Sequence, residues 1–394
     1  MTQLESNTSL QPLHHTPKVA LVHDFLVAYG GAERVFEALC ELYPEAPIYT
    51  LLYDGERMGE HFQGRDIRTS WLGKLPRFVQ KRYRLFLPFF PSAVESLDLR
   101  EFNLVISSSG AWTKGIITRL HTTHIAYLHS PMRYAWDYHE SYLQELGARG
   151  RRSILTRMLM SYLRIWDRQA AERPDCLIAN SHFTQARIRK YYRRDATVIY
   201  PGALELSRRA SPEALRQETV DHKAQPYFLI VARLTQSKRV AAVVQAFNKL
   251  ALPLVVVGTG PEEARLKKLG DRNIRFTGFV GDDELISLYR GARALIFPSE
   301  EDFGMVAAEA LSFGIPVIGL DYGGAREIVT PGVSGEFFHV SAPEIIAEAV
   351  RRFLQKEGTY SVEAMKVSVA QFSNENFQRQ ISEAISKLPI SDDK

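Results

Sequence analysis

Two pairs of charged residues in the second half of the chain have a spacing suited to ligand binding. Arg233 and Lys238 follow the apolar run "YFLIV", and an arginine fork with a lysine point charge can clamp a phosphate. The alternative is a solvated basic loop, the usual fate of such side chains. Glu301 and Glu309 lie eight residues apart within "PSEEDFGMVAAEALSFGIPV", about two helical turns. Burying Glu309 among alanine, valine and leucine is costly, which indicates a specific partner.

The segment after Gly304 is predicted to be a helix. A helix start offers unpaired N–H groups and a positive dipole end, which favour a phosphate or a sugar hydroxyl. Glu301 could accept hydrogen bonds from sugar hydroxyls, and Glu309 from a ribose diol. In the structural alternative, Glu300, Glu301 and Asp302 are N-terminal capping charges, and Glu309 pairs with a nearby arginine. The final interpretation keeps Glu301 for the sugar and leaves Glu300 and Asp302 as flanking or capping charges.

A histidine in the first half of the chain also ends a predicted strand. His129 stands in "HIAYLHSPMRYAWD", where an apolar run passes into a loop. From the residues alone, a structural histidine and a functional one are equally expected at this position.

These residues are positioned by short strands that alternate with helical stretches. The run "KVALVHDF" leads through Gly30 and Gly31 into a helical periodicity, and similar strand-to-helix units recur along the chain. A polar segment interrupts the pattern, which then restarts. The fold class is therefore α/β, with two Rossmann-like, doubly wound domains facing across a cleft, where ligands bind at the carboxyl ends of the strands. The expected parts are a disordered leader (1–17), an N-terminal domain (18–204), an exposed linker (205–225), a C-terminal domain (226–370) and a C-terminal helix packing back on the N-terminal domain (371–394).

Composition excludes several classes of protein. The 394 residues carry a net charge of +4 and an ordinary apolar fraction of 45%, as in a soluble globular protein. No run of eighteen apolar residues could span a membrane, and the polar N-terminus lacks the apolar core of a signal peptide. Cys40 and Cys176 have no metal-like spacing. We expect a cytoplasmic protein.

The motifs together resemble those of the retaining GT-B glycosyltransferases of family 4. The resemblance rests on the E-x7-E pair in "EEDFGMVAAEALSFGIPVIGLDYGGAREIV", on "RLTQSK" as an Arg-x4-Lys clamp and on "GGAE" as the N-terminal glycine loop. "TSWLGKLP", "LPFFPSAVESLDL" and "HSPMRYAWD" are similar to the mannosyltransferase branch that builds O-antigen and surface polysaccharide. The similarity extends over nearly all of the chain from residue 18 to residue 388.

The resemblance implies a role for each site residue. The N-terminal domain would bind the acceptor and the C-terminal domain the donor. Catalytic roles would fall to His129, Arg233, Lys238 and Glu301. Beyond Arg233 and Lys238 on the pyrophosphate and Glu309 on the ribose, the donor would be bound by Gly30, Gly31, Thr277, Gly278, Phe279, Val280, Glu301, Phe303, Gly304 and Met305. No metal and no other cofactor is expected.

The implied activity is transfer of a hexose, most often mannose from GDP-mannose, to a lipid-linked or oligosaccharide acceptor in surface polysaccharide synthesis. Cations and the helix start would stabilise the leaving nucleoside diphosphate, while the acceptor hydroxyl attacks the same face of the sugar. A UDP-sugar-dependent glucosyl- or galactosyltransferase is the alternative. A sugar-nucleotide epimerase and a non-catalytic nucleotide-sugar sensor are less favoured.

Two stretches, 67–91 and 148–169, combine arginine and lysine with aromatic or aliphatic residues. This character suits peripheral contact with an anionic membrane on its cytoplasmic face. It would also suit nucleic acid, but no nucleic-acid motif accompanies it, and none is expected as a partner. Ordinary packed helices with solvated arginines are the alternative.

Overall fold

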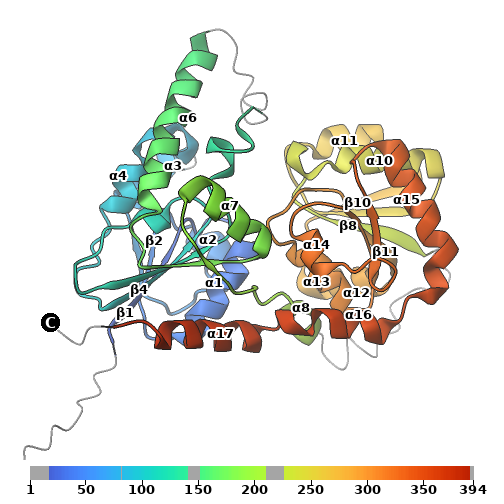
Figure 1. Cartoon of the computed structure of the whole chain (residues 1–394). Coiled ribbons are helices and arrows are strands. Elements are labelled where there is room, and N and C mark those ends of the chain that lie inside the picture. Colours follow the sequence, from blue (N-terminus) through green and yellow to red (C-terminus); the bar gives the residue numbers. More distant parts are fainter. Residues whose placement is uncertain (1–16, 81, 141–150, 210–225, 391–394) are drawn as a thin grey trace, which may run out of the picture.

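The structure, a computed structural model, describes residues 17–80, 82–140, 151–209 and 226–390. The expected leader lies outside these residues, apart from Pro17. Figure 1 shows two lobes side by side, each built around its own sheet.

The first lobe contains a parallel sheet with the strand order β3-β2-β1-β4-β5-β6-β7. Every residue of β4 and β5 is buried, as expected when helices cover both faces of a parallel sheet. The strands are β1 (Val19–His23), β2 (Ile48–Thr50), β3 (Ile67–Thr69), β4 (Leu104–Ser109), β5 (Thr123–Leu128), β6 (Cys176–Ala179) and β7 (Thr197–Val198).

The second lobe repeats this arrangement with the strand order β10-β9-β8-β11-β12-β13, again all parallel. In both sheets the order reverses beside the first strand, as in doubly wound folds. The predicted fold class is therefore confirmed. The strands are β8 (Tyr227–Val231), β9 (Leu254–Val257), β10 (Ile274–Gly278), β11 (Ala292–Phe297), β12 (Val317–Leu320) and β13 (Gly335–Phe338).

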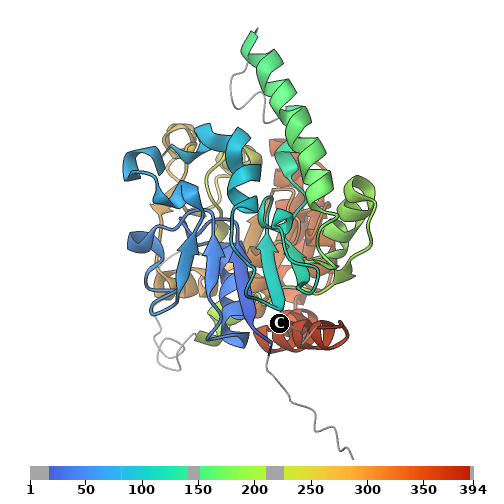
Figure 2. The ribbon, with the colours of Figure 1, turned by 90° about the vertical axis from the view of Figure 1, so that its left-hand side faces the viewer.

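Helices cover both faces of each sheet and form separate hydrophobic cores on them. In the first lobe the helices are α1 (Gly31–Leu42), α2 (Gly55–Met58), α3 (Arg77–Gln80), α4 (Phe90–Glu95), α6 (Arg151–Ala170) and α7 (His182–Tyr192), with 3-10 turns η1 (Trp71–Lys74), η2 (Tyr83–Phe89), η3 (Thr113–Gly115) and η4 (Arg133–Ala135). Seen in Figures 1 and 2, α6 extends well beyond the body of this lobe.

The helices of the second lobe follow the strands in the same alternation. They are α10 (Val240–Leu250), α11 (Glu263–Leu269), α12 (Asp282–Arg290), α13 (Met305–Ser312), α14 (Ala325–Ile328), α15 (Pro343–Lys356) and α16 (Val362–Val369), with 3-10 turns η5 (Gln236–Lys238), η6 (Glu357–Thr359) and η7 (Ala370–Phe372).

Two segments connect the lobes. The expected linker begins with a short helix, α8 (Glu205–Arg209), whose Leu206 is buried in the second lobe's core, so this part of the linker differs from the exposed segment predicted. Residues 210–225 lie outside the described chain. The helix α17 (Asn374–Ser386) returns to the first lobe, where Phe377 packs edge-on against Tyr127 of β5.

A buried ion pair joins α6 to η3, the 3-10 turn that follows β4. The Lys114 Nζ lies 2.5 Å from the Asp167 Oδ1, and both side chains have no exposed surface. The other Asp167 oxygen accepts hydrogen bonds from the Trp136 indole and the Tyr192 hydroxyl. Such a cluster is costly to disrupt because a removed partner leaves a buried charge behind.

Candidate functional site

The start of α13 is left open by the local backbone. Gly304 adopts a φ of +104°, which an L side chain rarely tolerates, and no side chain caps the helix. A Cβ on this glycine would also lie 3.0 Å from the Phe297 ring. The Ala307 N–H donates to the Gly304 carbonyl, but no side-chain oxygen caps the first turn of α13, so the N–H groups that precede Ala307 are suited to a ligand's oxygen atoms.

Lys238 and Glu301 meet beside this helix start. The Lys238 Nζ lies 2.6 Å from the Glu301 Oε1, which also accepts a hydrogen bond of 3.0 Å from the Ser299 hydroxyl. Both charged side chains keep about a quarter of their surface exposed. Arg233 is exposed in the loop after β8 and has no side-chain partner among the described residues. The structure thus brings one cation of the predicted clamp to the predicted sugar carboxylate and leaves the other facing solvent.

Glu309 is buried, with 3% of its surface exposed. Its Oε1 is 2.5 Å from the Arg34 Nη1 of the first lobe, and its Oε2 accepts a 2.9 Å hydrogen bond from the Tyr289 hydroxyl. Burial raises the pKa of the Glu309 carboxyl, while Arg34 and Tyr289 oppose that rise. The arginine partner that the structural alternative required is therefore present, and it comes from the opposite domain.

Glu300 and Asp302 flank α13 but do not cap it, so of the two expected roles the capping one was wrong. The Glu300 Oε2 accepts a 2.9 Å hydrogen bond from the Tyr138 hydroxyl of the first lobe. The Asp302 Oδ1 is 2.5 Å from the Arg187 Nη1, and its Oδ2 accepts a hydrogen bond from Arg133. The three acidic residues therefore have different partners. Glu300 and Asp302 bind residues of the first lobe, whereas Glu301, between them, pairs with Lys238.

The predicted base-binding segment lies at the carboxyl end of β10, the edge strand of the second sheet. Thr277 and Gly278 end β10, and Gly278 has a φ of +79°. Phe279 is 83% exposed, whereas Val280 is buried in the second lobe's core. An exposed aromatic ring on a turned backbone offers a surface on which a base could stack.

The glycine loop of the first lobe approaches α13 across the domain boundary. A Cβ on Gly31 would lie 2.9 Å from the Met305 sulfur, closer than real Cβ atoms come. Met305 packs against the hydrophobic cores of both lobes. A residue larger than glycine at position 31 would therefore require the Met305 side chain to shift. Phe303, by contrast, buries its ring against Tyr200.

His129 lies directly after β5 in a row of hydrogen-bonding groups. Its Nε2 is 2.8 Å from the Ser108 Oγ, which is in turn 3.1 Å from the Nδ1 of His23. The His23 Nε2 lies 3.4 Å from a Glu33 carboxylate oxygen. Burial, and then the neighbouring His23, lower the pKa of His129 to about 4. The imidazole is therefore neutral near neutral pH.

Sequence reasoning missed Arg34, Arg133, Arg187, His23 and Ser108. Arg34 directly follows "GGAE", and His23 ends its strand just as His129 does, so both had a weak positional signal. Arg133 lies within "HSPMRYAWD", but nothing in the sequence linked Arg133 or Arg187 to Asp302, because this shared partner lies more than a hundred residues away from both.

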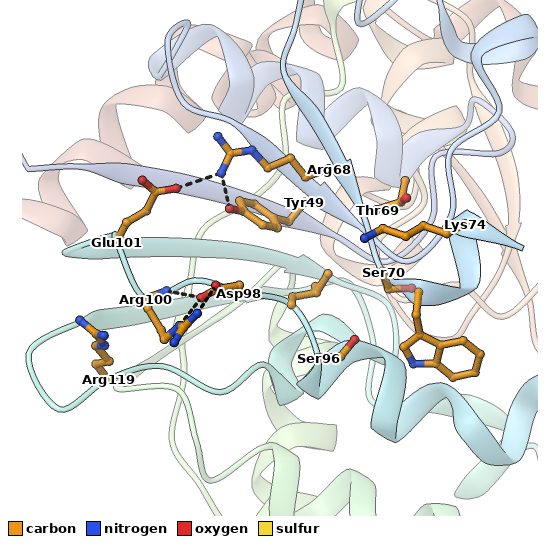
Figure 3. Close-up of a pocket in the computed structure, with 12 residues that line it drawn as sticks. Tyr49, Arg68, Thr69, Ser70, Lys74, Ser96, Asp98, Arg100, Glu101 and Arg119 are labelled. Atoms are coloured by element: carbon orange, nitrogen blue, oxygen red, sulfur yellow. Dashed lines mark hydrogen bonds and ion pairs between the residues drawn. The ribbon is translucent and has the colours of Figure 1, made fainter.

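A separate cavity of about 710 Å³ lies on the first lobe and contains none of the predicted site residues (Figure 3). Arg68 is held there by the Glu101 carboxylate and the Tyr49 hydroxyl. Arg68, Trp71 and Lys74 belong to the stretch predicted to touch a membrane, yet they line this cavity. Its lining is Tyr49, Arg68, Thr69, Ser70, Trp71, Lys74, Ser96, Leu97, Asp98, Arg100, Glu101 and Arg119.

Within the described residues, no three His, Cys, Asp or Glu side chains gather in an arrangement that could hold a metal ion.

Comparison with known proteins places the chain in a family. Residues 29–203 match the family model "Glycosyltransferase Family 4", and residues 212–388 match "Glycosyl transferases group 1". The chain is 29% identical over 198 residues to the O-antigen chain mannosyltransferase C of Escherichia coli, a match covering 47% of this chain and 52% of that protein. It is 32% identical over 123 residues to a GDP-mannose-dependent alpha-mannosyltransferase of Corynebacterium glutamicum, covering 31% and 30%.

These matches span about half or less of the length of the curated relatives. The crystal structure of Anabaena HepE in complex with UDP and glucose has the same fold, with a TM-score of 0.68 at 20% identity, covering 94% of this chain and all of that one. Two family models in the expected order, on two lobes of the expected architecture, agree with the sequence motifs. The chain belongs to the GT-B glycosyltransferases of family 4.

Proposed function

We propose that this protein transfers a mannosyl residue from GDP-mannose to a lipid-linked or oligosaccharide acceptor, with retention at the anomeric carbon. The observation that carries the proposal is the group at the start of α13. Glu301 stands next to Lys238, beside uncapped N–H groups, and Glu309 lies buried two turns further on. A nucleoside diphosphate sugar presents the matching series of sugar hydroxyls, phosphates and ribose.

The proposed reaction depends on stabilising the leaving group. Cleavage of the anomeric C–O bond leaves the electron pair on the nucleoside diphosphate, where Lys238, Arg233 and the start of α13 stabilise the negative charge. The acceptor hydroxyl forms the new C–O bond on the same face, and its proton passes to the departing phosphate oxygen. Glu301 orients the sugar rather than forming a covalent bond to it, in contrast to the paired-carboxylate glycosidases.

Mannose is favoured over other sugars by the names of two relatives, the O-antigen chain mannosyltransferase and the GDP-mannose-dependent alpha-mannosyltransferase. A UDP-sugar is the second candidate, because HepE, of the same fold, binds UDP and glucose. The exposed Phe279 ring would stack on either base.

The test is a thermal-shift panel of GDP, UDP and ADP, each with and without its sugar. A ligand that binds only the folded protein raises the apparent stability with the logarithm of its saturation. We expect GDP and GDP-mannose to raise the melting temperature selectively. A UDP-selective shift would overturn the mannose proposal, and GDP-mannose consumption without release of GDP would overturn transfer in favour of an epimerase.

We further propose that the first lobe rests on an anionic membrane surface, where a lipid-linked acceptor is found. Support comes from exposed apolar side chains on α6, which extends from the body of the lobe (Figure 2). Arg157 and Arg168 of this helix lie near acidic residues, which partly neutralise their charge. We therefore expect apolar contact to contribute more to membrane binding than basic charge does. No described helix is both long and apolar enough to span a bilayer. The exposed side chains are Ile154, Leu155, Met158, Tyr162 and Ile165.

Co-sedimentation with vesicles tests this contact. Leu155→Glu should lower binding to vesicles rich in phosphatidylglycerol, because it places a charge on the apolar stripe. Val367→Glu is the matched control, since Val367 of α16 is 74% exposed and lies on the other lobe. Equal vesicle binding by Leu155→Glu and the wild type would contradict the proposal.

A further inference from the structure

Four polar side chains form a continuous row at the carboxyl ends of three neighbouring strands. His23 ends β1, Ser108 lies near the end of β4, and His129 follows β5. The sheet register pairs His23 with Ser108 directly. Glu33, in the first turn of α1, completes the row beside His23. The parallel sheet therefore fixes the order Glu33–His23–Ser108–His129, with separations of 3.4, 3.1 and 2.8 Å.

The Glu33 carboxylate, at one end of the row, determines which nitrogen and oxygen atoms of the row carry protons. An ionised Glu33 can only accept, so it favours a proton on the His23 Nε2. A neutral His23 then has a bare Nδ1, which accepts from the Ser108 hydroxyl. With its proton used in this way, the Ser108 oxygen is an acceptor for the Nε2–H of His129. His129 is left with a bare Nδ1.

The surroundings hold this arrangement in place. The His23 ring stacks on Phe36 with centroids 4.7 Å apart, and the His129 ring meets Tyr127 edge-on at 5.3 Å. Charged groups that act on His129 are His23, Glu33, Asp24 and Asp302. Asp24 is already occupied, because it accepts hydrogen bonds from the backbone N–H groups of the loop 110–113.

We propose that Glu33, His23 and Ser108 are positioning residues that hold His129 as its Nε2–H tautomer, so that its Nδ1 accepts a hydrogen bond from a hydroxyl of the bound sugar or acceptor. The part concerning the sugar rests on the proposed transferase function. The tautomer itself does not depend on it.

The direct test is the ¹⁵N spectrum of histidine side chains in the ligand-free protein at about pH 8, above the ordinary histidine range. His129→Gln identifies the signals of His129. We expect a pyrrole-type Nε2 and a pyridine-type Nδ1 in the wild type. A pyrrole-type Nδ1 would overturn the proposal. In Glu33→Gln we expect a mixture of both tautomers, because an amide can donate as well as accept; an unchanged spectrum would also overturn it.

Kinetics separate positioning from a purely structural role. When the partner that orients a metal-bound imidazole is removed, the loss is on the order of 10- to 100-fold, and this sets the scale for kcat in Glu33→Gln. Glu41→Gln is the matched control, since Glu41 lies on the same helix and bonds only to Gln378 among the described side chains.

Ser108→Ala should lower kcat similarly, and adding Glu33→Gln to it should cause little further loss, because the row is already broken. Fully multiplicative losses would overturn the proposal. The spectra need no substrate, so the two proposals can fail separately. If transfer occurs but His129 has the other tautomer, only the positioning proposal is refuted. If His129 has the predicted tautomer but no transfer occurs, only the proposed function is refuted.

Discussion

Replacement of Glu309 gives the sharpest test of the donor site. In Glu309→Gln the amide oxygen can accept from Arg34 and the amide N–H can donate to the Tyr289 oxygen, so both partners keep a hydrogen bond. The variant loses the negative charge that would accept the hydrogen bond from the ribose. A hydrogen bond to a charged group contributes about 1.5–3 kcal/mol and one to a neutral group about 0.5–1.5 kcal/mol. The difference, roughly 1–1.5 kcal/mol, predicts about a five- to tenfold weaker Kd for the nucleoside diphosphate.

Glu309→Ala removes the acceptor altogether. The expected loss is then about 1.5–3 kcal/mol, or roughly ten- to 150-fold in Kd. Calorimetric titration with GDP measures both variants, and thermal unfolding checks that the fold is intact. The graded order wild type, Gln, Ala is the expected result.

Glu336 supplies a matched control. It is a nearly buried glutamate of the same domain, and like Glu309 it is bound by one cation and one tyrosine, here Lys356 and Tyr360. Glu336→Gln should change stability but not GDP affinity. The reasoning would be refuted if the Glu309 variants bound GDP as well as the wild type, or if Glu336→Gln weakened GDP binding equally.

The raised pKa of Glu309 gives this prediction a pH dependence. Protonation removes the same charge as the Gln variant, so GDP affinity should begin to fall at a pH above the ordinary glutamate value of 4.5. The sign for stability is opposite. The folded protein holds the Glu309 proton more tightly than the unfolded chain does. The stabilisation that comes from this tighter proton binding is therefore lost as the pH rises through the pKa of the folded state.

Four further variants test other parts of the structure. Lys238→Ala should reduce the preference for a nucleoside diphosphate over the monophosphate, measured by titration, since it removes a phosphate cation; an unchanged preference would contradict the clamp. Lys114→Met should lower the unfolding free energy in urea by about 3–5 kcal/mol, because it leaves Asp167 buried and unpaired. Burial is the main cause that lowers the pKa of His124 to about 3. Below the unfolded value near 6.5, the unfolding free energy should therefore fall with falling pH, by up to about 1.4 kcal/mol per pH unit. His124→Gln should reduce that slope. Asp302→Asn should loosen the two lobes and raise the radius of gyration in small-angle scattering, whereas an identical profile would show that this contact does not hold them.

The fold was predictable because its evidence is local. Each predicted strand is a short apolar run that must be buried in the sheet, and the run "YFLIV" has the same bounds as β8 in the structure. Alternation with helical stretches then leaves few topologies, since parallel strands require crossover helices. The linker was less predictable. Its polar composition gave no sign that Leu206 is buried in the core of the second lobe.

The sequence by itself determined which residue types could bind a nucleotide sugar, because the E-x7-E and Arg-x4-Lys spacings lie within single strand-to-helix units. Only the tertiary structure decided their partners. Arg34 meets Glu309 across 275 positions, and Arg187 meets Asp302 across 115. The row from Glu33 to His129 likewise depends on the order of strands in the sheet. The physical reason is range: backbone propensity and hydrophobic periodicity act over a few residues, whereas an ion pair needs only proximity in space, which the packing of two lobes supplies.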